Sequence, residues 1–236
     1  MKRFWMTLLL APVLCMQALA QDTPTAQQVM DKYIAAIGGK EFLSTVNDLR
    51  IEMSSEANGN PVMITRRMKA PNKFSQVINA NGMEVMRMTG DGTKIAMGGM
   101  RGNQTIEGAA AQGQLLQNTL FGEMRYADLG VKSTVVGTEA VNGKDTYKVV
   151  HTSADGAVTW TDFYDKESGL KVQTMSQQRG GPQGPQTVTM QYKDYKDFKG
   201  LKYPTTIAQS GGRAMEMSVD KVKVNDGVKD SEFEIK

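Results

Sequence analysis

VNDLRIEMSSEANGNPVMITRRMK, residues 46–69, is the stretch that decides the fold. Leu49, Ile51 and Met53 alternate with polar residues, and the alternation returns from Val62 onward. A period of two indicates a strand with one buried face, because successive side chains point to opposite sides. The intervening Asn58-Gly59-Asn60 is typical of a hairpin turn. The stretch therefore predicts two antiparallel strands that share an apolar face.

The same pattern continues on both sides of this hairpin, with polar turns such as Asn81-Gly82 and Asn142-Gly143 between the runs. Strands are predicted over residues 46–54, 62–69, 74–79, 84–89, 94–97, 131–140, 146–152, 158–164, 170–177, 187–195, 202–209 and 213–224. A flat sheet of this size would curl or split, so the fold class is mainly β, a barrel or a strongly curved antiparallel sheet.

Two segments break the period of two. Thr25 can cap a helix whose apolar residues recur at helical spacing until Gly38-Gly39 ends it. Residues 107–120 contain Ala109-Ala110-Ala111 and three leucines with few β-branched residues, which favours a second helix. This second helix has too few apolar residues to be stable alone, so we expect it to lie on the sheet.

The first 20 residues have the pattern of a secretory signal peptide. Lys2 and Arg3 precede an apolar run, and Ala18-Leu19-Ala20 completes an A-x-A cleavage site. Cys15 follows Leu14, whereas a lipoprotein signal places a small residue before the modified cysteine, so cleavage after Ala20 is favoured over a lipid anchor at Cys15. We therefore expect a periplasmic protein, residues 21–236, forming one domain.

Composition excludes several classes of site. Removing residues 1–20 leaves 216 residues and lowers the formal charge from +3 to +1, which argues against nucleic acid as a partner. No later stretch reaches the roughly 18 apolar residues of a membrane span. Cys15 is the only cysteine and His151 the only histidine, so a Cys-His pair and a multi-histidine zinc site are excluded by counting.

No catalytic constellation is recognisable in the sequence. Neighbours on its own strand place no serine or carboxylate beside His151, which is interpreted as a packed or rim residue. Asp162, Asp165 and Glu167 match no calcium loop and are interpreted as a solvated turn. No phosphate-binding loop or cofactor motif is present, so we expect no cofactor, no metal and no catalytic residue.

The strands share one dry face, which predicts an apolar cavity between the sheet and the helices. Fourteen methionines lie after residue 20, and their flexible thioethers suit a surface that accepts variable apolar shapes, although ordinary core packing would also use them. They cluster at Met53, Met63, Met68, Met83, Met86, Met88, Met97 and Met100. The candidate lining residues are Ile51, Met53, Ile64, Arg66, Phe74, Met86, Met88, Tyr147, Val149, Trp160, Met190 and Tyr192.

Two details of this face have alternatives. Arg66 shares its parity with Val62 and Ile64, so it and not Arg67 is expected to face the cavity, where a carbonyl of the covering helix or an anionic head group could accept its hydrogen bonds. A bulge or the cavity rim could also let Arg66 reach water. A copper site at Met83, Met86 and Met88 is not favoured, because no histidine or cysteine is near and strict alternation sends Met83 to the other face.

Several short motifs and the order of the elements resemble a known superfamily. The motifs are Ile34-Ala35-Ala36-Ile37-Gly38-Gly39-Lys40-Glu41, Val46-Asn47-Asp48-Leu49-Arg50, Tyr164-Asp165-Lys166-Glu167-Ser168-Gly169-Leu170, Tyr192-Lys193-Asp194-Tyr195 and Gly200-Leu201-Lys202-Tyr203-Pro204. Together they resemble the outer-membrane lipoprotein-sorting (LolA/LolB-like) superfamily, in a poorly characterised branch with the Gly-Gly-Lys-Glu opening. The resemblance implies an incomplete antiparallel β-barrel of about 11–12 strands, wrapped around short helices, with a cavity for lipid or acyl chains.

Three hypotheses for function follow. The first is a monomeric, non-enzymatic, periplasmic binder or carrier of a lipid-like or acyl-chain ligand, in lipoprotein sorting or envelope maintenance. The second is an envelope interaction or scaffold module that binds another envelope protein and fills its cavity with its own side chains. The third, an enzyme, has no support in the residues.

The signal-peptide interpretation predicts that the exported protein begins at Gln21. Expression in a bacterium with intact secretion, followed by intact-mass measurement, should give the mass of residues 21–236. A protein that begins at a lipid-modified Cys15, or that still carries Met1, would contradict it.

Overall fold

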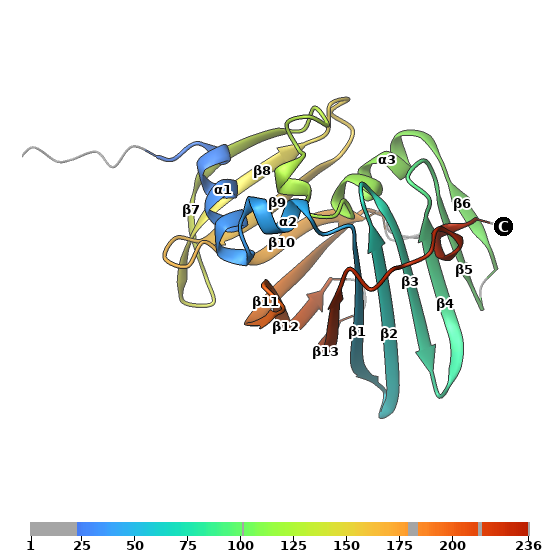
Figure 1. The fold of residues 1–236 in the computed structure, drawn as a ribbon. Coiled ribbons are helices and arrows are strands. Elements are labelled where there is room, and N and C mark those ends of the chain that lie inside the picture. The colour runs from blue at the N-terminus through green and yellow to red at the C-terminus, as the bar shows by residue number, and fades with distance from the viewer. Residues whose placement is uncertain (1–22, 101, 179–183, 212–213, 236) are drawn as a thin grey trace, which may run out of the picture.

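A computed structural model describes residues 23–100, 102–178, 184–211 and 214–235. The expected signal peptide and Cys15 lie outside the described residues. In the part that is described, thirteen strands form one antiparallel sheet (Figure 1). The strands are β1 (Asp48–Ala57), β2 (Asn60–Lys69), β3 (Lys73–Ala80), β4 (Met83–Gly90), β5 (Ile95–Gly99), β6 (Gln104–Ile106), β7 (Lys132–Val141), β8 (Lys144–Thr152), β9 (Thr159–Asp165), β10 (Lys171–Gln178), β11 (Gln186–Phe198), β12 (Leu201–Ser210) and β13 (Met215–Val224).

The chain enters this sheet in the middle. The strand order is β6-β5-β4-β3-β2-β1-β13-β12-β11-β10-β9-β8-β7, so the chain runs from β1 to one edge, crosses to the other edge and returns to pair β13 with β1. The two edges, β6 and β7, do not pair with each other. The predicted mainly β, incomplete antiparallel barrel is confirmed. Its thirteenth strand is β6, which is three residues long and was missing from the sequence-based strands.

Predicted Asn-Gly turns connect several of these strands. Asn58, Asn81 and Asn142 have φ values of 53°, 51° and 50°, and each precedes a glycine that also has positive φ. Two consecutive residues with positive φ make the type I′ turn, whose twist matches that of the flanking strands. The hairpins β1–β2, β3–β4 and β7–β8 are therefore fixed by local sequence.

Bulges change the register at four places in the described sheet, and two of them bear on residues discussed in the sequence analysis. Ile78 pairs with Met86 but Asn79 pairs with Glu84, so Val85 is an extra residue in β4. On β7 and β8, Val135 pairs with Val149 but Gly137 pairs with Lys148, so Val136 is the extra residue there. A classical bulge of this kind shifts the side-chain alternation by one residue. The expectation that Met83 lies on the face opposite Met86 is therefore wrong.

Helices occupy the concave side of the sheet (Figure 1). Helix α1 (Ala26–Ile37) has the predicted Thr25 cap, which accepts a hydrogen bond from the Gln28 amide, and ends at Gly38, whose φ is 147°. The short α2 (Lys40–Ser44) follows and leads into β1. On the convex side, η2 (Asp230–Phe233) contacts β3.

Residues 107–131, which we call the crossing segment, connect the two edges of the sheet. They contain α3 (Gly108–Gln117) and η1 (Gly122–Met124). Helix α3 packs against both halves of the sheet. A Cβ added at Gly90 of β4 would lie 3.1 Å from Leu115 of the helix, and one added at Gly113 of the helix would clash with Val158, just before β9. Glycine at these two positions lets the helix approach both parts of the sheet closely.

Weak local determinants hold α3 in place. No side-chain hydrogen bond caps its first turn, and its buried residues are the small Ala111 and Gly113 together with Leu115. Few apolar contacts and an uncapped end make local opening easier. We therefore predict that amides of residues 107–120 exchange with deuterium faster than those of residues 158–164. Equal protection in a native-state exchange experiment would mean that α3 belongs to the permanent core.

Candidate functional site

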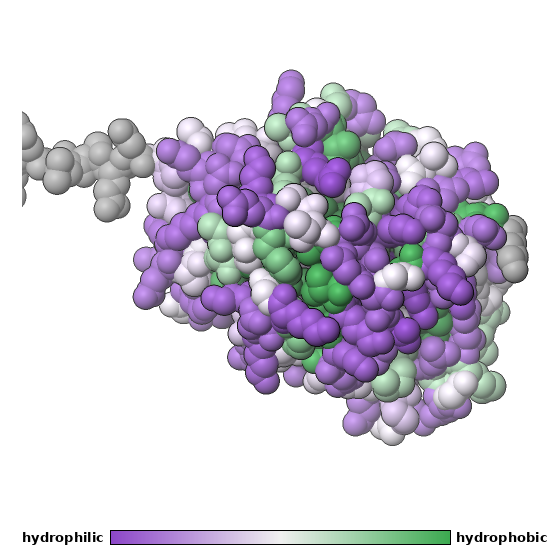
Figure 2. All heavy atoms as spheres, viewed as in Figure 1, coloured by the Kyte–Doolittle hydropathy of each residue, from purple (hydrophilic) through white to green (hydrophobic). Residues whose placement is uncertain are grey.

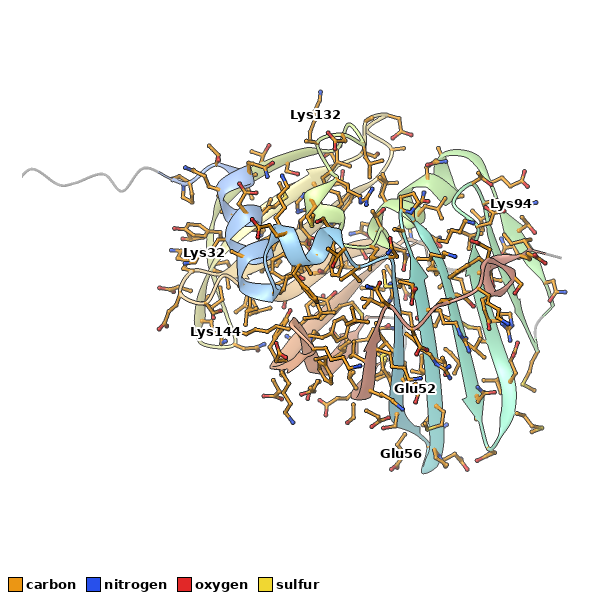
Figure 3. The ribbon with its side chains drawn as sticks, viewed as in Figure 1. Lys32, Glu52, Glu56, Lys94, Lys132 and Lys144 are labelled. Atoms are coloured by element: carbon orange, nitrogen blue, oxygen red, sulfur yellow. The ribbon has the colours of Figure 1, made fainter. Side chains whose placement is uncertain are left out.

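A cavity of about 250 Å³ lies between the concave face and the crossing segment. Its walls come from α1, β1–β3, β10–β13 and the crossing segment. In the space-filling view, hydrophobic side chains gather in a band below α1 and α2, between largely hydrophilic surfaces (Figure 2). Charged side chains such as Lys94, Lys132 and Lys144 lie at the periphery of the molecule (Figure 3).

The apolar wall of the cavity is rich in methionine. Met53 and Met68 come from β1 and β2, Met190 from β11, and Met215 and Met217 from β13. Of the eight methionines that cluster in the sequence, two therefore line the cavity. Four others, Met63, Met83, Met86 and Met100, are exposed, and Met100 is the most exposed at 87%.

The structure brings together four of the twelve sequence-predicted lining residues, Met53, Arg66, Met190 and Tyr192. The other eight lie elsewhere. Ile51, Ile64 and Phe74 are fully buried in the main core beside the cavity, and Met88 packs against that core. Met86 is 37% exposed because its partner across β5 is Gly99, which has no side chain to cover it.

The remaining three are in the half of the sheet beneath α1. Val149 packs with Ala26, Val29 and Tyr164, whereas Tyr147 lines a separate surface pocket next to α1. Trp160 is 2% exposed and stacks on His151, and its other ring neighbour is Tyr126, which does line the cavity.

Arg66 faces the cavity, and Arg67 faces the other side. The Arg66 guanidinium donates a hydrogen bond of 2.6 Å to the Asn118 side-chain carbonyl, at the C-terminal end of α3. Its Nε is buried without an acceptor in the described part of the chain. Arg67 lies 3.8 Å from Glu232 in η2, on the convex face. Arg66 is thus a cation whose acceptor is a neutral amide of the covering helix.

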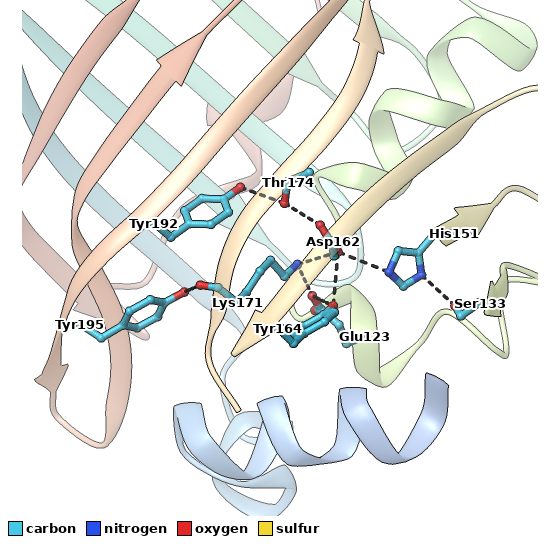
Figure 4. A network of polar contacts seen from close by, with 9 residues as sticks. All are labelled: Glu123, Ser133, His151, Asp162, Tyr164, Lys171, Thr174, Tyr192 and Tyr195. Atoms are coloured by element: carbon cyan, nitrogen blue, oxygen red, sulfur yellow. Dashed lines mark hydrogen bonds and ion pairs between the residues drawn. The ribbon is translucent and has the colours of Figure 1, made fainter. Parts of the chain in front are cut away.

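The other end of the cavity is built around Lys171 on β10 (Figure 4). Its ammonium contacts Glu123 of η1 and lies 3.0 Å from Asp162 on β9. The same ammonium lies over the rings of Tyr33 and Tyr164, 5.3 and 5.6 Å from their centres. One buried cation therefore joins the crossing segment, the sheet and α1.

Hydrogen bonds extend this cluster away from the cavity. Asp162 accepts a 2.5 Å bond from Thr174, and its other oxygen is 3.4 Å from His151 Nε2. His151 Nδ1 lies 2.8 Å from the Ser133 hydroxyl. His151 is fully buried, as the packed interpretation expects, but the structure places beside it a serine and a carboxylate that the pattern of its own strand does not indicate. Its neighbours come from the strands paired on either side of β8, and the bulge at Val136 brings Ser133 opposite it.

The charges in this cluster stabilise one another. Burial alone would raise the pKa of Asp162, but Lys171 and the nearby His151 ring outweigh burial and hold that pKa well below its usual range. Burial alone would lower the pKa of Lys171, but Asp162 and Glu123 raise it well above the usual value. Asp162 and Lys171 are therefore both ionised at neutral pH, and each depends on the other.

Five tyrosines complete the polar part of the wall: Tyr33, Tyr126, Tyr192, Tyr195 and Tyr203. Burial raises the pKa of each of them. Their phenols are therefore protonated and can donate hydrogen bonds. Two of these donors are already used, because Tyr195 donates to the Lys171 carbonyl at 2.8 Å and Tyr192 to Thr174 at 3.3 Å.

The acidic residues Asp162, Asp165 and Glu167 do not form one site. Asp162 is buried in the cluster, and the Asp165 carboxylate accepts hydrogen bonds from the Glu167 and Ser168 amides of the turn. Within the described ranges, no group of three or more His, Cys, Asp or Glu residues is arranged to hold a metal ion. Among those same residues, no helix is long and apolar enough to span a bilayer.

These features suit binding of an amphiphile. The cavity offers methionines to an apolar chain, phenols and a guanidinium to a polar group, and a covering helix. Ser133 contacts His151, and His151 contacts Asp162, but none of these three residues lines the cavity. A substrate inside the cavity would therefore not meet the serine hydroxyl.

Comparison with known proteins identifies the fold. No family model and no curated protein sequence matches the chain. A LolA superfamily protein from Nitrosomonas europaea matches in structure with a TM-score of 0.58 and 13% identity, covering 90% of this chain and 99% of that one. A DUF1329 family protein from Desulfovibrio piger gives 0.56 and 13%, over 90% and 98% of the two chains.

A third structure, named as an outer membrane lipoprotein-sorting protein domain from Vibrio parahaemolyticus, gives a TM-score of 0.53 and 11% identity, over 88% and 95%. The chain therefore has the fold of LolA superfamily and DUF1329 proteins across about 90% of its length, and the fold resemblance expected from the sequence motifs is confirmed. At these identities the likeness concerns the fold alone.

The buried cluster predicts a large effect of Lys171→Met on stability. This change leaves two buried carboxylates without their cation, and we expect the free energy of unfolding to fall by about 3–5 kcal/mol, as for other broken buried ion pairs. Lys144→Met is the matched control and should cost less than about 1 kcal/mol, because Lys144 is 55% exposed and its partner Asp165 keeps the hydrogen bonds from the Glu167 and Ser168 amides. Urea unfolding at pH 7 measures both. Equal losses would mean that the cluster does not fasten the fold.

The same cluster predicts how the stability of the fold changes at acidic pH. Because the pKa of Asp162 is lower in the folded chain than in the unfolded one, its ionised form stabilises the fold above roughly pH 4 and this contribution is lost as the pH falls. Lys171→Met removes the main cause of the lowered pKa. The midpoint of acid unfolding should therefore move to higher pH in this variant, and an unchanged midpoint would contradict the assignment.

Proposed function

We propose that the protein is an exported, periplasmic, non-enzymatic binder or carrier of a lipid-like ligand with an acyl chain. The observation that carries this proposal is the cavity itself, which combines five methionines with a guanidinium whose Nε has no acceptor among the described residues, beneath a weakly held helix. The protein would act as a monomer, in lipoprotein sorting or envelope maintenance. The name of the Vibrio domain, which refers to lipoprotein sorting, agrees with this role.

The size of the cavity supports a ligand that enters by displacing the crossing segment. About 250 Å³ is below the roughly 300–1,000 Å³ of sites that enclose drug-sized ligands. A longer acyl chain therefore needs the space that the crossing segment occupies. Leu115 and Leu120 of that segment are buried against the sheet and would be the side chains that the chain replaces.

The contacts of the crossing segment suggest which part moves. Asn118 is held by one hydrogen bond to Arg66, whereas Glu123 is held by a buried ammonium. Between them Phe121 has a φ of 49°, an uncommon conformation for a bulky residue. We infer that α3 swings away as a flap about residues 119–122, while η1 stays attached to Lys171.

A second candidate function is an envelope interaction module. The observation in its favour is that Leu115 and Leu120 are only 1% and 3% exposed, so the protein fills much of its own concave face. Such a module would bind another envelope protein and need no small ligand. The two candidates predict different contents for the purified protein.

Native mass spectrometry separates them. Residues 21–236, purified from a bacterial periplasm and mixed with phospholipid or fatty acid, should retain an adduct with the mass of the lipid. If no adduct forms with any lipid, and the apo mass is the only species, the interaction module is the better account.

Arg66 provides the mutational test. For a fatty acid, Arg66→Ala should weaken binding by about 1.5–3 kcal/mol, the range for a hydrogen bond to a charged group, and weaken binding of the matching fatty alcohol much less. Trp160, the only tryptophan after residue 20, reports on the cavity through its contact with Tyr126. Arg67→Ala on the convex face is the control. Equal effects of the two substitutions would remove Arg66 from the site.

A further inference from the structure

Four methionines lie next to one another on the concave face of β4 and β5, outside the cavity. They are Met83, Met86 and Met88 of β4 and Met97 of β5. The cavity ends beside them at Gln76, which pairs with Met88 in the ladder. The proposed lipid site uses none of these four side chains.

The strand register places all four on one face. Met88 is directly opposite Met97, and Met86 is opposite Ile78, which shares its face with Gln76. Because Val85 is the extra residue of the bulge, Met83 comes opposite Ala80, two residues further along that same face of β3. Strict alternation would have sent Met83 to the convex side.

An ion pair on the other face supports this orientation independently. The Arg87 guanidinium donates two hydrogen bonds to the Glu84 carboxylate, at 2.9 and 2.6 Å. Glu84 and Arg87 can meet in this way only if both point to the same side of β4, and Arg87 also lies near Glu232 of η2, on the convex side. Their neighbours Met83, Met86 and Met88 then point to the concave side. The paired Glu84 and Arg87 charges also cancel, so the methionine face has no unbalanced cation behind it.

The row is open to solvent. Met83 and Met86 are 68% and 37% exposed, and Met88 and Met97 are half-buried. Gly98 and Gly99 follow Met97 on β5, and a Cβ at Gly99 would lie only 2.8 Å from the Val85 carbonyl. In the described part of β5, Gly99 therefore puts no side chain over Met86, and an ion could reach the sulfur atoms directly.

We propose that Met86, Met88 and Met97 bind one Cu(I) ion through their thioether sulfurs, whereas Met83 comes opposite Ala80, too far along the strand from Met88 to share that ion. Directly opposite residues in a ladder have Cβ atoms about 5 Å apart, and next neighbours on a face are about 7 Å apart along the strand. The three rotatable bonds of methionine let sulfurs at these spacings converge. Soft thioethers select Cu(I), whereas hard cations such as Mg²⁺ prefer the carboxylates and carbonyls that these side chains lack.

The experiment uses the metal alone, on residues 21–236. Cu(I), kept reduced by ascorbate, is titrated against the chromophoric competitor bicinchoninate, and Ag(I) serves as a redox-inert analogue. We expect one ion per chain. Met86→Leu/Met88→Leu should weaken binding at least tenfold, because leucine preserves the apolar volume and removes the sulfur. Met83→Leu alone, at an exposed position near a hairpin tip and out of reach of the ion, should leave binding and folding unchanged.

Met63→Leu/Met100→Leu is the matched control, since these are exposed methionines outside the row. An equal loss in the control, or full binding by the variant that lacks the thioethers of Met86, Met88 and Met97, would overturn the proposal. Lipid uptake by that variant should be unchanged. Loss of metal binding with lipid uptake intact separates this site from the proposed carrier function, and neither result depends on the other.

Discussion

The contact of Lys171 with Glu123 joins the sheet to the segment that covers it. An open sheet of thirteen strands has a concave apolar face that water must not reach, and only the helices and the crossing segment are available to cover it. The crossing segment buries Leu115, Leu120, Tyr126 and Val131 in the core. Its η1 part is held in addition by one cation, Lys171, which contacts Asp162, Tyr33 and Tyr164.

This constraint explains the division of the crossing segment into two parts. The η1 end is fastened by charge and carries Glu123, whereas the α3 end rests on small residues and on one hydrogen bond from Arg66. Breaking a neutral-acceptor hydrogen bond costs little compared with exposing a buried ion pair. We therefore expect the cavity to open at α3, on the side that is lined by the methionines and by the Arg66 guanidinium.

Much of this architecture could be predicted from the sequence, because the period of two and the Asn-Gly turns act locally. The strands, their antiparallel order and the inward direction of Arg66 follow from those signals. The bulges at Val85 and Val136 could not be predicted, since an extra residue at either position leaves no mark in the hydrophobic pattern. One bulge turns Met83 to the concave face, and the other places Ser133 beside His151.

The partners of Lys171 could not be predicted from the sequence either, because they meet only when the strands and the crossing segment are assembled. Glu123 lies 48 positions before Lys171 in the chain and in a segment with no strand pattern. The one available signal was the position of Lys171 directly after the Gly169-Leu170 turn. The alternation of apolar and polar residues alone does not distinguish such a lysine from a surface lysine. The four lining residues that were predicted correctly lie on strands, as do missed ones such as Met68 and Met217. The lining residues of the crossing segment and of α1 have no strand pattern that could indicate them.

The most direct test of the account is to lock α3 shut. A Cβ at Gly113 would lie 3.0 Å from that of Val158, close to the roughly 3.5–4.5 Å of a disulfide, and residues 21–236 contain no other cysteine. Gly113→Cys/Val158→Cys should therefore take up a fluorescent fatty acid when reduced and lose that uptake when oxidised. Equal uptake in the two states would mean that α3 does not gate the cavity.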